Sequence, residues 1–422
     1  MTQPPPEVAR AHDTLPTRCD VLVVGAGPAG AAGAQQLAQA GFDCLLVDQH
    51  VFPRDKVCGD GLIPDTHAAL QRLGVADEVA AAATAVRFVR LVGPRGGLID
   101  VPGTLSVLSR MELDHILVRA AQRAGARLLA PLRFEAPVLE DGRVVGARFK
   151  DLLRPGQPHE IRARWVVLAT GAIPAALSAA GMCERHTPSG VALRGYVKND
   201  SMVGRITQLQ IVWHPQLLGG YGWIFPAPGG LFNIGAGLTG SHLRQANGKG
   251  RMKVGNLRHM LDAFCEIYAP AGELMRTGTL VGEIKGAPLR CSMVGARLSR
   301  PGLLVAGEAA GSTYAFSGEG IGKAMETGML AAAALVQHGL AEGAADAQVQ
   351  AHYERSLLAL KPKFDLYETA SRVNYHPWLA DLVIWRARRS PRILRRLSGV
   401  LEETQNPGRL FTWRGLRKLM FE

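Results

Sequence analysis

Residues 20–30 read DVLVVGAGPAG, an apolar run of strand length that passes directly into a glycine-rich turn. The stretch AAGAQQLAQAG follows with a helix-forming composition, and a second apolar run, DCLLVD, ends at Asp48. A strand, a GxGxxG turn, a helix and a second strand with a terminal acid together make the complete dinucleotide-binding fingerprint. The stretch therefore predicts a Rossmann-type α/β domain near the start of the chain.

Each small residue of the turn has its own expected role. Gly25 permits the tight turn, Gly27 lets the backbone approach a pyrophosphate, and Gly30 with Ala34 allows the helix to pack closely on the strand. The diphosphate is expected at the amino end of the helix, where free N–H groups and the helix dipole favour an anion. Asp48 lies 18 residues after Gly30 and is expected to bind ribose hydroxyls. The predicted cofactor contacts of this region also include Ala29 and Gln49.

Length and composition set outer limits on the architecture. A chain of 422 residues with 47% hydrophobic and 20% charged residues is globular and long enough for more than one domain. No run approaches the roughly 18 apolar residues of a membrane-spanning helix. The first residues, MTQPPPEVARAHD, lack the apolar core of a signal peptide, which predicts a cytoplasmic protein. The six cysteines are scattered without CxxC spacing, so they predict neither a metal site nor a disulfide framework.

Two later segments favour FAD over NAD as the dinucleotide. RWVVLATGA (164–172) is an apolar run ending in Ala-Thr-Gly, and GLLVAGEAAG (302–311) leads through SGEGIGKAMETG into a helix that runs to about Val336. This order resembles the glutathione-reductase-like FAD proteins. The resemblance implies that Glu308, where the family usually has Asp, binds the ribityl or pyrophosphate region, and that the backbone of 318–322 holds the pyrimidine end of the isoalloxazine. Arg110 matches an arginine that opens a helix beside the FAD. The cofactor residues implied here are Arg110, Thr170, Gly171, Glu308, Gly318, Gly320, Ile321 and Gly322.

The remaining segments are rich in strand-forming residues. In particular, YGWIFPAPGGLFNIGAGL (221–238) alternates on both sides of Pro-Gly-Gly, which predicts a hairpin. The predicted fold is therefore α/β, with a Rossmann-type FAD-binding domain, an inserted β-rich substrate domain and a helical C-terminal region. The predicted ranges are 1–85, 110–185 and 295–345 for the FAD-binding domain, 86–109 and 186–294 for the substrate domain, and 346–422 for the basic helical region.

Three motifs carry a more specific resemblance. FPRDKVCGDGLIP (52–64), YGWIFP (221–226) and GEAAG followed by SGEGIGKAMETG (307–328) resemble the geranylgeranyl reductase family of flavoproteins. The resemblance implies an enzyme with FAD as cofactor and NAD(P)H or another donor as a transient reductant. It also implies a reaction, the reduction of carbon–carbon double bonds of a long apolar, isoprenoid or polyketide-like substrate by hydride transfer from flavin N5.

By the same resemblance, Lys56, Cys58 and Gly59 border the flavin. A double glycine is commoner after the cysteine, and here Asp60 takes the second place. Three roles remain open for Cys58: lining of the flavin site, a catalytic or redox thiol, and an inert buried thiol. On an extended strand residues 56 and 58 share a face, so Lys56 is a candidate to stabilise a thiolate.

The alternative enzyme class is a flavin-dependent monooxygenase or halogenase that uses reduced FAD and oxygen. YGWIFP differs from the halogenase signature W-x-W-x-I-P at Tyr221 and Phe225 and has the form of the reductases. Tyr221 and Trp223 are the expected lining of the apolar channel and, with Cys58, the candidate catalytic residues. The proton donor stays open among Tyr221, Cys58 and a flavin-bound water. A flavoprotein scaffold without enzymatic activity predicts FAD binding but no substrate pocket.

The net charge of +12 is concentrated near the C-terminus, where ten Lys or Arg residues face two acids between Arg386 and Lys418. Helical spacing of apolar residues at 393–401, with Ser390 as N-cap and Pro391 in the first turn, predicts a basic amphipathic helix. Two interpretations stay open, a peripheral contact with an anionic membrane and packing on the protein itself. The expected partners are an apolar small molecule or lipid, this membrane surface and a separate reductase or ferredoxin, with no nucleic acid.

Overall fold

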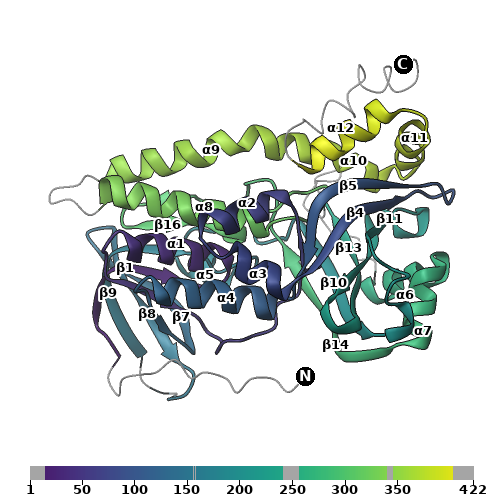
Figure 1. Cartoon of the computed structure of the whole chain (residues 1–422). Helices are drawn as coiled ribbons and strands as arrows, with labels where there is room; N and C mark the ends of the chain where they lie inside the picture. The colour runs from purple at the N-terminus through teal and green to yellow at the C-terminus, as the bar shows by residue number, and fades with distance from the viewer. Residues whose placement is uncertain (1–14, 155, 157, 241–255, 340–345, 403–422) are drawn as a thin grey trace.

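The computed structural model describes residues 15–154, 156, 158–240, 256–339 and 346–402. Two eight-stranded sheets lie side by side, and a long helix, α9 (Asp346–Ala370), runs across the first of them toward the second (Figure 1). Among the described helices none is long and apolar enough to cross a membrane.

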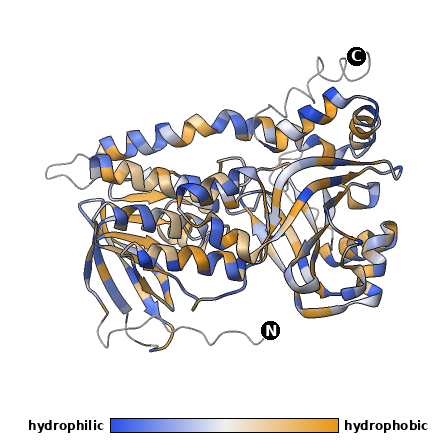
Figure 2. Cartoon of the chain, viewed as in Figure 1, coloured by the Kyte–Doolittle hydropathy of each residue, from blue (hydrophilic) through white to orange (hydrophobic). Residues whose placement is uncertain are grey.

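The first sheet contains the dinucleotide fingerprint. Its strands, in order, are β15 (Ser299–Arg300), β16 (Leu303–Val305), β9 (Pro158–Leu168), β1 (Arg18–Val24), β2 (Cys44–Val47) and β6 (Arg127–Leu129). In addition, β8 (Arg143–Asp151) pairs with β9, and β7 (Leu132–Glu140) pairs with β8. β1 pairs in parallel with both β2 and β9, and its residues from Val21 to Val24 are almost fully buried. Burial on both faces explains why these strands are continuous apolar runs in the sequence and do not alternate. Figure 2 shows this concentration of apolar residues in the sheet.

Helices α1 (Pro28–Gln39), α4 (Arg110–Arg123) and α8 (Ile321–Ala334) pack with the first sheet into one hydrophobic core. The shorter helices α2 (Pro64–Arg72) and α3 (Ala76–Ala82) extend that core, and α5 (Ala175–Ala179) contributes to the second core on the sheet's other side. The predicted class, a Rossmann-type α/β fold with a second β-rich unit and a helical C-terminal region, is confirmed.

The second sheet is mostly antiparallel. Its strands, in order, are β14 (Thr279–Leu289), β10 (Gly190–Lys198), β13 (Leu231–Thr239), β12 (Gly220–Ala227), β11 (Leu209–Val212), β4 (Thr84–Val92), β5 (Leu98–Val107) and β3 (Gly61–Leu62). The hairpin predicted around Pro-Gly-Gly is confirmed as the antiparallel pair β12–β13, which is joined by a 3₁₀ turn at Pro228–Gly230.

Two groups of helices cover the second sheet. Helices α6 (Leu257–Ile267) and α7 (Ala269–Thr277) pack with one set of strand residues, and α10 (Arg372–Tyr375), α11 (Trp378–Ala387) and α12 (Pro391–Leu401) pack with another. The predicted domain ranges stay a prediction, because pairing of strands does not define a domain boundary. β3 lies before the first predicted substrate segment yet joins the second sheet through β5.

Candidate active site

The glycine turn has the geometry that the fingerprint requires. Gly25 has φ +100°, and a Cβ there would overlap the carbonyl oxygen of Ala169. A Cβ on Gly30 would overlap the carbonyl oxygen of Gly25. A side chain is therefore sterically excluded at both positions, and the turn brings the amino end of α1 against the strand ends.

Small residues also let α1 approach α8 closely. A Cβ on Gly328 would overlap the carbonyl oxygen of Ala29, and one on Gly33 would lie 3.0 Å from the carbonyl oxygen of Gly328. Ala29 is buried at this contact, and its Cβ would lie 2.7 Å from one placed on Gly307. This helix contact was not predicted, although Gly328 belongs to the AMETG end of the third motif.

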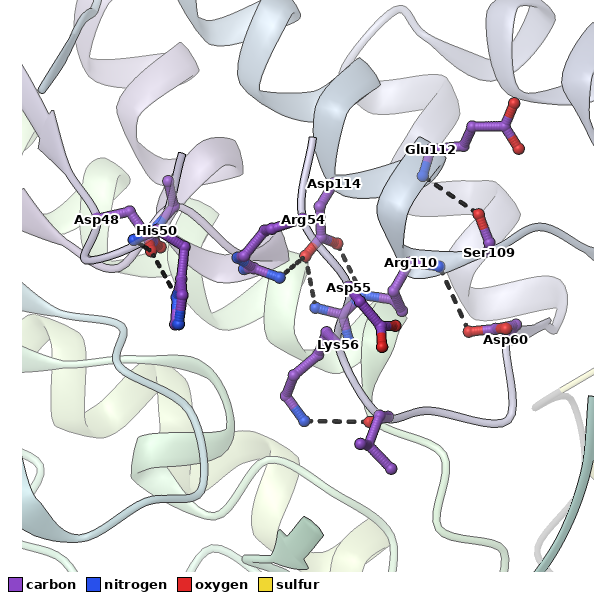
Figure 3. A network of polar contacts seen from close by, with 12 residues as sticks. Asp48, His50, Arg54, Asp55, Lys56, Asp60, Ser109, Arg110, Glu112 and Asp114 are labelled. Carbon is purple, nitrogen blue, oxygen red and sulfur yellow. Dashed lines mark hydrogen bonds and ion pairs between the residues drawn. The ribbon is translucent and has the colours of Figure 1, made fainter. Parts of the chain in front are cut away.

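Gly27, in contrast, faces two guanidinium groups. A Cβ on Gly27 would lie 3.7 Å from Arg54 Nη2 and 3.8 Å from Arg110 Nη2. Both arginines pair with the fully buried Asp114: Arg110 donates from Nε and Nη2 over 2.7 and 2.8 Å, and Arg54 Nη1 lies 3.0 Å from Oδ2 (Figure 3). The charges of Asp48 and Asp60 also act on Arg54 and Arg110, respectively, so the two guanidinium groups belong to a wider charged cluster beside the first turn of α1. This arrangement fits a diphosphate, which needs compensating charge and N–H donors.

The charge state of this cluster follows from its contacts. Burial alone would lower the pKa of Arg110, but the charge and hydrogen bonds of Asp114 raise it, so the guanidinium stays charged. Arg110 is thus where the sequence predicted it, at the start of α4. Arg54 was missed, and the only sequence signal for it was its place in FPRDKVCG, next to residues already assigned to the flavin.

Asp48 lies at the end of β2 and is nearly buried. Its Oδ2 accepts the N–H of Ala26 over 2.8 Å, and its Oδ1 accepts the N–H of His50 over 2.9 Å. Burial alone would raise the pKa of Asp48, but His50, Arg54 and the two backbone N–H groups together lower it, so the carboxylate is ionised. The neighbouring Gln49 is exposed. Asp48 remains a predicted ribose contact, and Gln49 remains a predicted cofactor contact.

The second and third FAD motifs meet the glycine turn. Thr170 follows β9, and its Cα would lie 3.2 Å from a Cβ on Gly25. Within the described ranges its buried hydroxyl has no hydrogen-bond partner, and the same holds for Ser317 just before α8. Gly171 has φ +74° and open space on its side-chain side. Buried hydroxyls are normally satisfied, so two unpaired ones beside the expected cofactor path fit a polar ligand with its own donors and acceptors.

Glu308 and the loop before α8 form the other end of this path. Glu308 Oε1 lies 3.4 Å from the N–H of Arg290 and from Thr313 Oγ1. Gly320 is the N-cap of α8, Ile321 is its first residue, and Gly322 faces the Asp65 carboxylate. Gly318 has φ +71°, and a Cβ there would lie 3.2 Å from the Tyr221 hydroxyl. That hydroxyl donates to the Ser317 carbonyl oxygen, which joins the predicted flavin loop to the YGWIFP motif.

The KVCGDG loop is not the extended strand assumed from the sequence. Residues 54–57 have no regular structure, and Lys56 Nζ donates to the Val57 carbonyl oxygen over 3.1 Å. Lys56 thus bonds to the backbone and not to the Cys58 thiol, and its charge is the weakest of the influences on the pKa of that thiol. Cys58 Sγ instead accepts the N–H of Asp60 over 3.4 Å, and burial and the Asp60 charge raise the pKa of the thiol. Within the described ranges all six cysteines are free, so Cys58 is a neutral thiol without a disulfide partner.

Asn233 on β13 connects the KVCGDG and YGWIFP motifs. Its Nδ2 donates to the Cys58 carbonyl oxygen and to Asp60 Oδ2, each over 2.8 Å. Its Oδ1 accepts the indole N–H of Trp223 over 2.9 Å. Ring contacts add to this link, since a Cβ on Gly59 would lie 3.2 Å from the Phe225 ring. Sequence reasoning missed Asn233, because an asparagine within a strand carries no pattern that marks it.

Asp60 is the buried acid of this link. It has φ +66°, is fully buried, accepts from the Tyr196 hydroxyl and from Asn233, and lies with Oδ1 3.3 Å from the N–H of Arg110. Burial raises its pKa to about 6, although the hydrogen bonds from Tyr196 and Asn233 oppose the shift. The residue at which the sequence departs from the family's double glycine is therefore a hydrogen-bond acceptor that joins the second sheet to the start of α4.

Comparison with known proteins agrees with this geometry. A family model described as FAD binding domain matches residues 18–207. A menaquinone reductase of Mycolicibacterium smegmatis is 32% identical over 82% of this chain and 86% of its own length. The chain belongs to the geranylgeranyl reductase family of FAD-dependent oxidoreductases. It is an FAD-dependent enzyme.

A more distant relative and two solved structures extend the comparison. A digeranylgeranylglycerophospholipid reductase of Methanoculleus marisnigri is 28% identical over 74% of this chain and 75% of its own length. A geranylgeranyl bacteriochlorophyll reductase-like protein of Thermoplasma acidophilum has a TM-score of 0.68 at 22% identity, with 96% of both chains covered. The flavin-dependent brominase Bmp2 has a TM-score of 0.72 at 18% identity, with 94% of this chain and 97% of its own covered. At these identities the two structures establish the fold alone.

This reductase-family enzyme has an apolar cavity next to its predicted flavin loop. The cavity has a volume of about 130 Å³ and lies between the second sheet and the C-terminal helices. Its lining is Val89, Leu91, Val101, Ile211, Trp213, Tyr221, Phe316, Ser317, Glu319, Tyr367, Val373, Ala380, Val383, Ile384, Leu397, Val400 and Leu401. Tyr221 is therefore a lining residue, as predicted. Trp223 is not part of this lining and serves instead as the donor to Asn233.

Helix α12 closes part of the cavity. Its apolar residues Leu397, Val400 and Leu401 line the cavity, and Ile393 is buried against the same cluster. Ser390 is the N-cap residue and Pro391 opens the helix, as predicted, although the Ser390 side chain makes no capping hydrogen bond. The sequence alone leaves two interpretations of this amphipathic helix open, membrane contact and packing on the protein. The structure shows its apolar face packed on the protein.

Proposed function

We propose that the enzyme reduces carbon–carbon double bonds of a long apolar substrate, of the isoprenoid or polyketide-like class. The observation that carries the proposal is the apolar cavity, which reaches Tyr221 and the 316–319 loop at the expected flavin site. The relatives named for reducing menaquinone and digeranylgeranylglycerophospholipids support an isoprenoid-type substrate. The residues of the glycine turn and of the 316–319 loop would hold the FAD, which, when reduced by NAD(P)H or another donor, would supply the hydride for one alkene carbon.

The protein's own side chains exclude water from this reaction. An isolated alkene has no carbonyl group to share developing charge, so stray water and a misplaced proton both compete with productive transfer. Among the described lining residues the aliphatic and aromatic side chains dominate, and polar atoms come from Ser317, Glu319 and the tyrosines. Trp213 stacks on Phe316 with ring centroids 6.2 Å apart, which fixes the wall beside the flavin loop.

The second alkene carbon needs a proton, and two side chains near the site stay protonated at neutral pH and could donate it. Burial raises the pKa of the Tyr221 phenol, and burial with the Asp60 charge raises that of the Cys58 thiol. Both groups are therefore neutral donors at physiological pH. Tyr221 lines the cavity directly, and its hydroxyl hydrogen bonds to the Ser317 carbonyl, so Tyr221 is the first candidate donor to test.

The decisive experiment is anaerobic. The purified flavoprotein is photoreduced, mixed with polyprenyl alkenes and saturated analogues, and flavin absorbance is followed without oxygen. We expect reoxidation only with the alkenes, together with a product two mass units heavier per double bond. Reoxidation that requires oxygen and yields an oxygenated or halogenated product would falsify the proposal in favour of a monooxygenase or halogenase. Repeating the assay with NADH, NADPH or reduced ferredoxin as the reductant identifies the electron donor.

A further inference from the structure

Helix α11 has two chemically different faces. Ala380, Val383 and Ile384 point inward and line the substrate cavity. On the outside, Trp378 and Trp385 are 56% and 45% exposed. These two positions are seven residues apart, so their side chains lie on the same side of the helix. A single helix therefore separates the cavity from an outer surface with two exposed indoles.

Two arginines lie against the outer Trp385. The guanidinium carbons of Arg389 and Arg386 lie 4.7 and 5.6 Å from the Trp385 ring centroid. Arg388, Arg392 and Arg395 are also exposed on α12 and on the turn before it. The acid of this helix, Asp381, is turned toward the β4–β5 connection, where it accepts the N–H of Arg95 over 3.2 Å. The exposed surface is thus aromatic and basic, a composition typical of the membrane interface.

The packing of α12 changes where a membrane contact can occur. The apolar residues of α12 are directed at the cavity and the second sheet, where Ile393 is buried and the others are partly buried, so only part of their surface is left for a bilayer. The large apolar side chains on the outer face of α11, Trp378 and Trp385, point away from the protein and are more exposed than the apolar residues of α12. Charge complementarity selects an anionic lipid surface over a neutral one, since each arginine near such a surface contributes roughly a fivefold gain in binding.

We propose that the outer face of α11, through Trp378, Trp385 and the neighbouring arginines, docks the enzyme on an anionic phospholipid bilayer. Its inner face is a wall of the cavity, so docking places the cavity one helix away from the lipid phase. This access role rests on the proposed apolar substrate, whereas the docking itself does not. A long apolar substrate would then reach the cavity beside α11 without crossing bulk water.

The test uses the full chain and vesicles without substrate. Flotation is measured with phosphatidylcholine vesicles and with phosphatidylcholine containing phosphatidylglycerol, and indole burial is read from quenching by brominated lipids. We expect binding only to the anionic vesicles, weakening as salt is added. Trp378→Ser with Trp385→Ser should lower the partition coefficient by about tenfold and abolish quenching. Arg388→Gln with Arg389→Gln should lower it roughly 25-fold.

Matched control variants show whether a loss of binding is specific to the outer face of α11. Ile173→Ser removes an exposed apolar side chain elsewhere (57% exposed), and Arg133→Gln with Arg148→Gln removes two exposed charges from β7 and β8. Both controls should bind like the wild type. The proposal is overturned if the full chain ignores anionic vesicles, if the tryptophan variant binds equally, or if the controls lose as much.

Anaerobic activity assays distinguish the membrane-access role of α11 from the proposed reductase activity. Anaerobic reoxidation by a detergent-dispersed alkene should be unchanged in the tryptophan variant and slowed about tenfold when the alkene is embedded in vesicles. Equal rates in both formats would refute the access role while leaving the reductase proposal intact. No reoxidation in either format for the wild type would refute the reductase proposal, and vesicle binding would still decide the docking surface.

Discussion

Replacing Asp60 with asparagine is the sharpest test of the hydrogen-bonded link between the KVCGDG loop and the YGWIFP strand. Asp60 is fully buried, and burial raises its pKa from 3.8 to about 6. A rise of this size corresponds to about 3 kcal/mol by which the ionised carboxylate destabilises the folded protein at neutral pH. The substituted amide would keep an oxygen for Tyr196 and Asn233 but would turn its NH₂ group toward the N–H of Arg110, at a cost of about 1 kcal/mol.

The expected result depends on pH in a definite direction. The folded pKa lies above the unfolded one, so the destabilisation is complete above pH 6 and is relieved as the pH falls toward 3.8. Asp60→Asn should therefore be more stable than wild type by about 2 kcal/mol at pH 7.5. That advantage should fall to about zero near pH 4.5, because the wild type regains about 2 kcal/mol over this interval.

Denaturant and thermal unfolding of both proteins at pH 7.5, 6.0 and 4.5 measure this difference. Asp262→Asn, an exposed position on α6, serves as the control and should show no such pH dependence. The reasoning fails if the stability difference between Asp60→Asn and wild type is the same at all three pH values. It also fails if the variant is less stable throughout, since the acid would then be held by interactions stronger than its desolvation.

Three further substitutions test the site. Arg54→Gln should weaken FAD binding about tenfold by removing a guanidinium group beside Gly27, whereas Arg133→Gln should not. Titration of the apoprotein with FAD measures both, and equal affinities would remove Arg54 from the site. Cys58→Ser should keep bound FAD and slow anaerobic reoxidation if the thiol has a functional role, and unchanged turnover would make it an inert wall residue. Because its pKa is raised, alkylation of Cys58 in the folded protein should still be increasing above pH 9, and a plateau below that pH would contradict the neutral thiol. Asn233→Leu should lower stability by about 3 kcal/mol, since Trp223 Nε1 and Asp60 each lose a partner; a change under about 1 kcal/mol in chemical unfolding would show that the link is dispensable.

The sequence by itself determined the cofactor half of the molecule. Gly25, Gly27, Gly30 and Asp48 were readable because they act through local backbone geometry over one strand–turn–helix unit. The β12–β13 hairpin was readable for the same reason, since alternation and a Pro-Gly-Gly turn are properties of neighbouring residues. Family membership followed from three short motifs whose order along the chain is preserved.

Only the tertiary structure decided how those motifs meet. Asn233 is 175 residues from Cys58, and no local pattern marks it, yet it joins the cysteine loop to Trp223. Arg54 and Arg110 act together because both reach one buried carboxylate at Asp114. The apolar face of α12 and the outer tryptophans of α11 have similar sequence signatures, and packing against the second sheet alone determines which one faces outward. Periodicity defines a helix face, but the residue it contacts depends on where the rest of the chain places its partner.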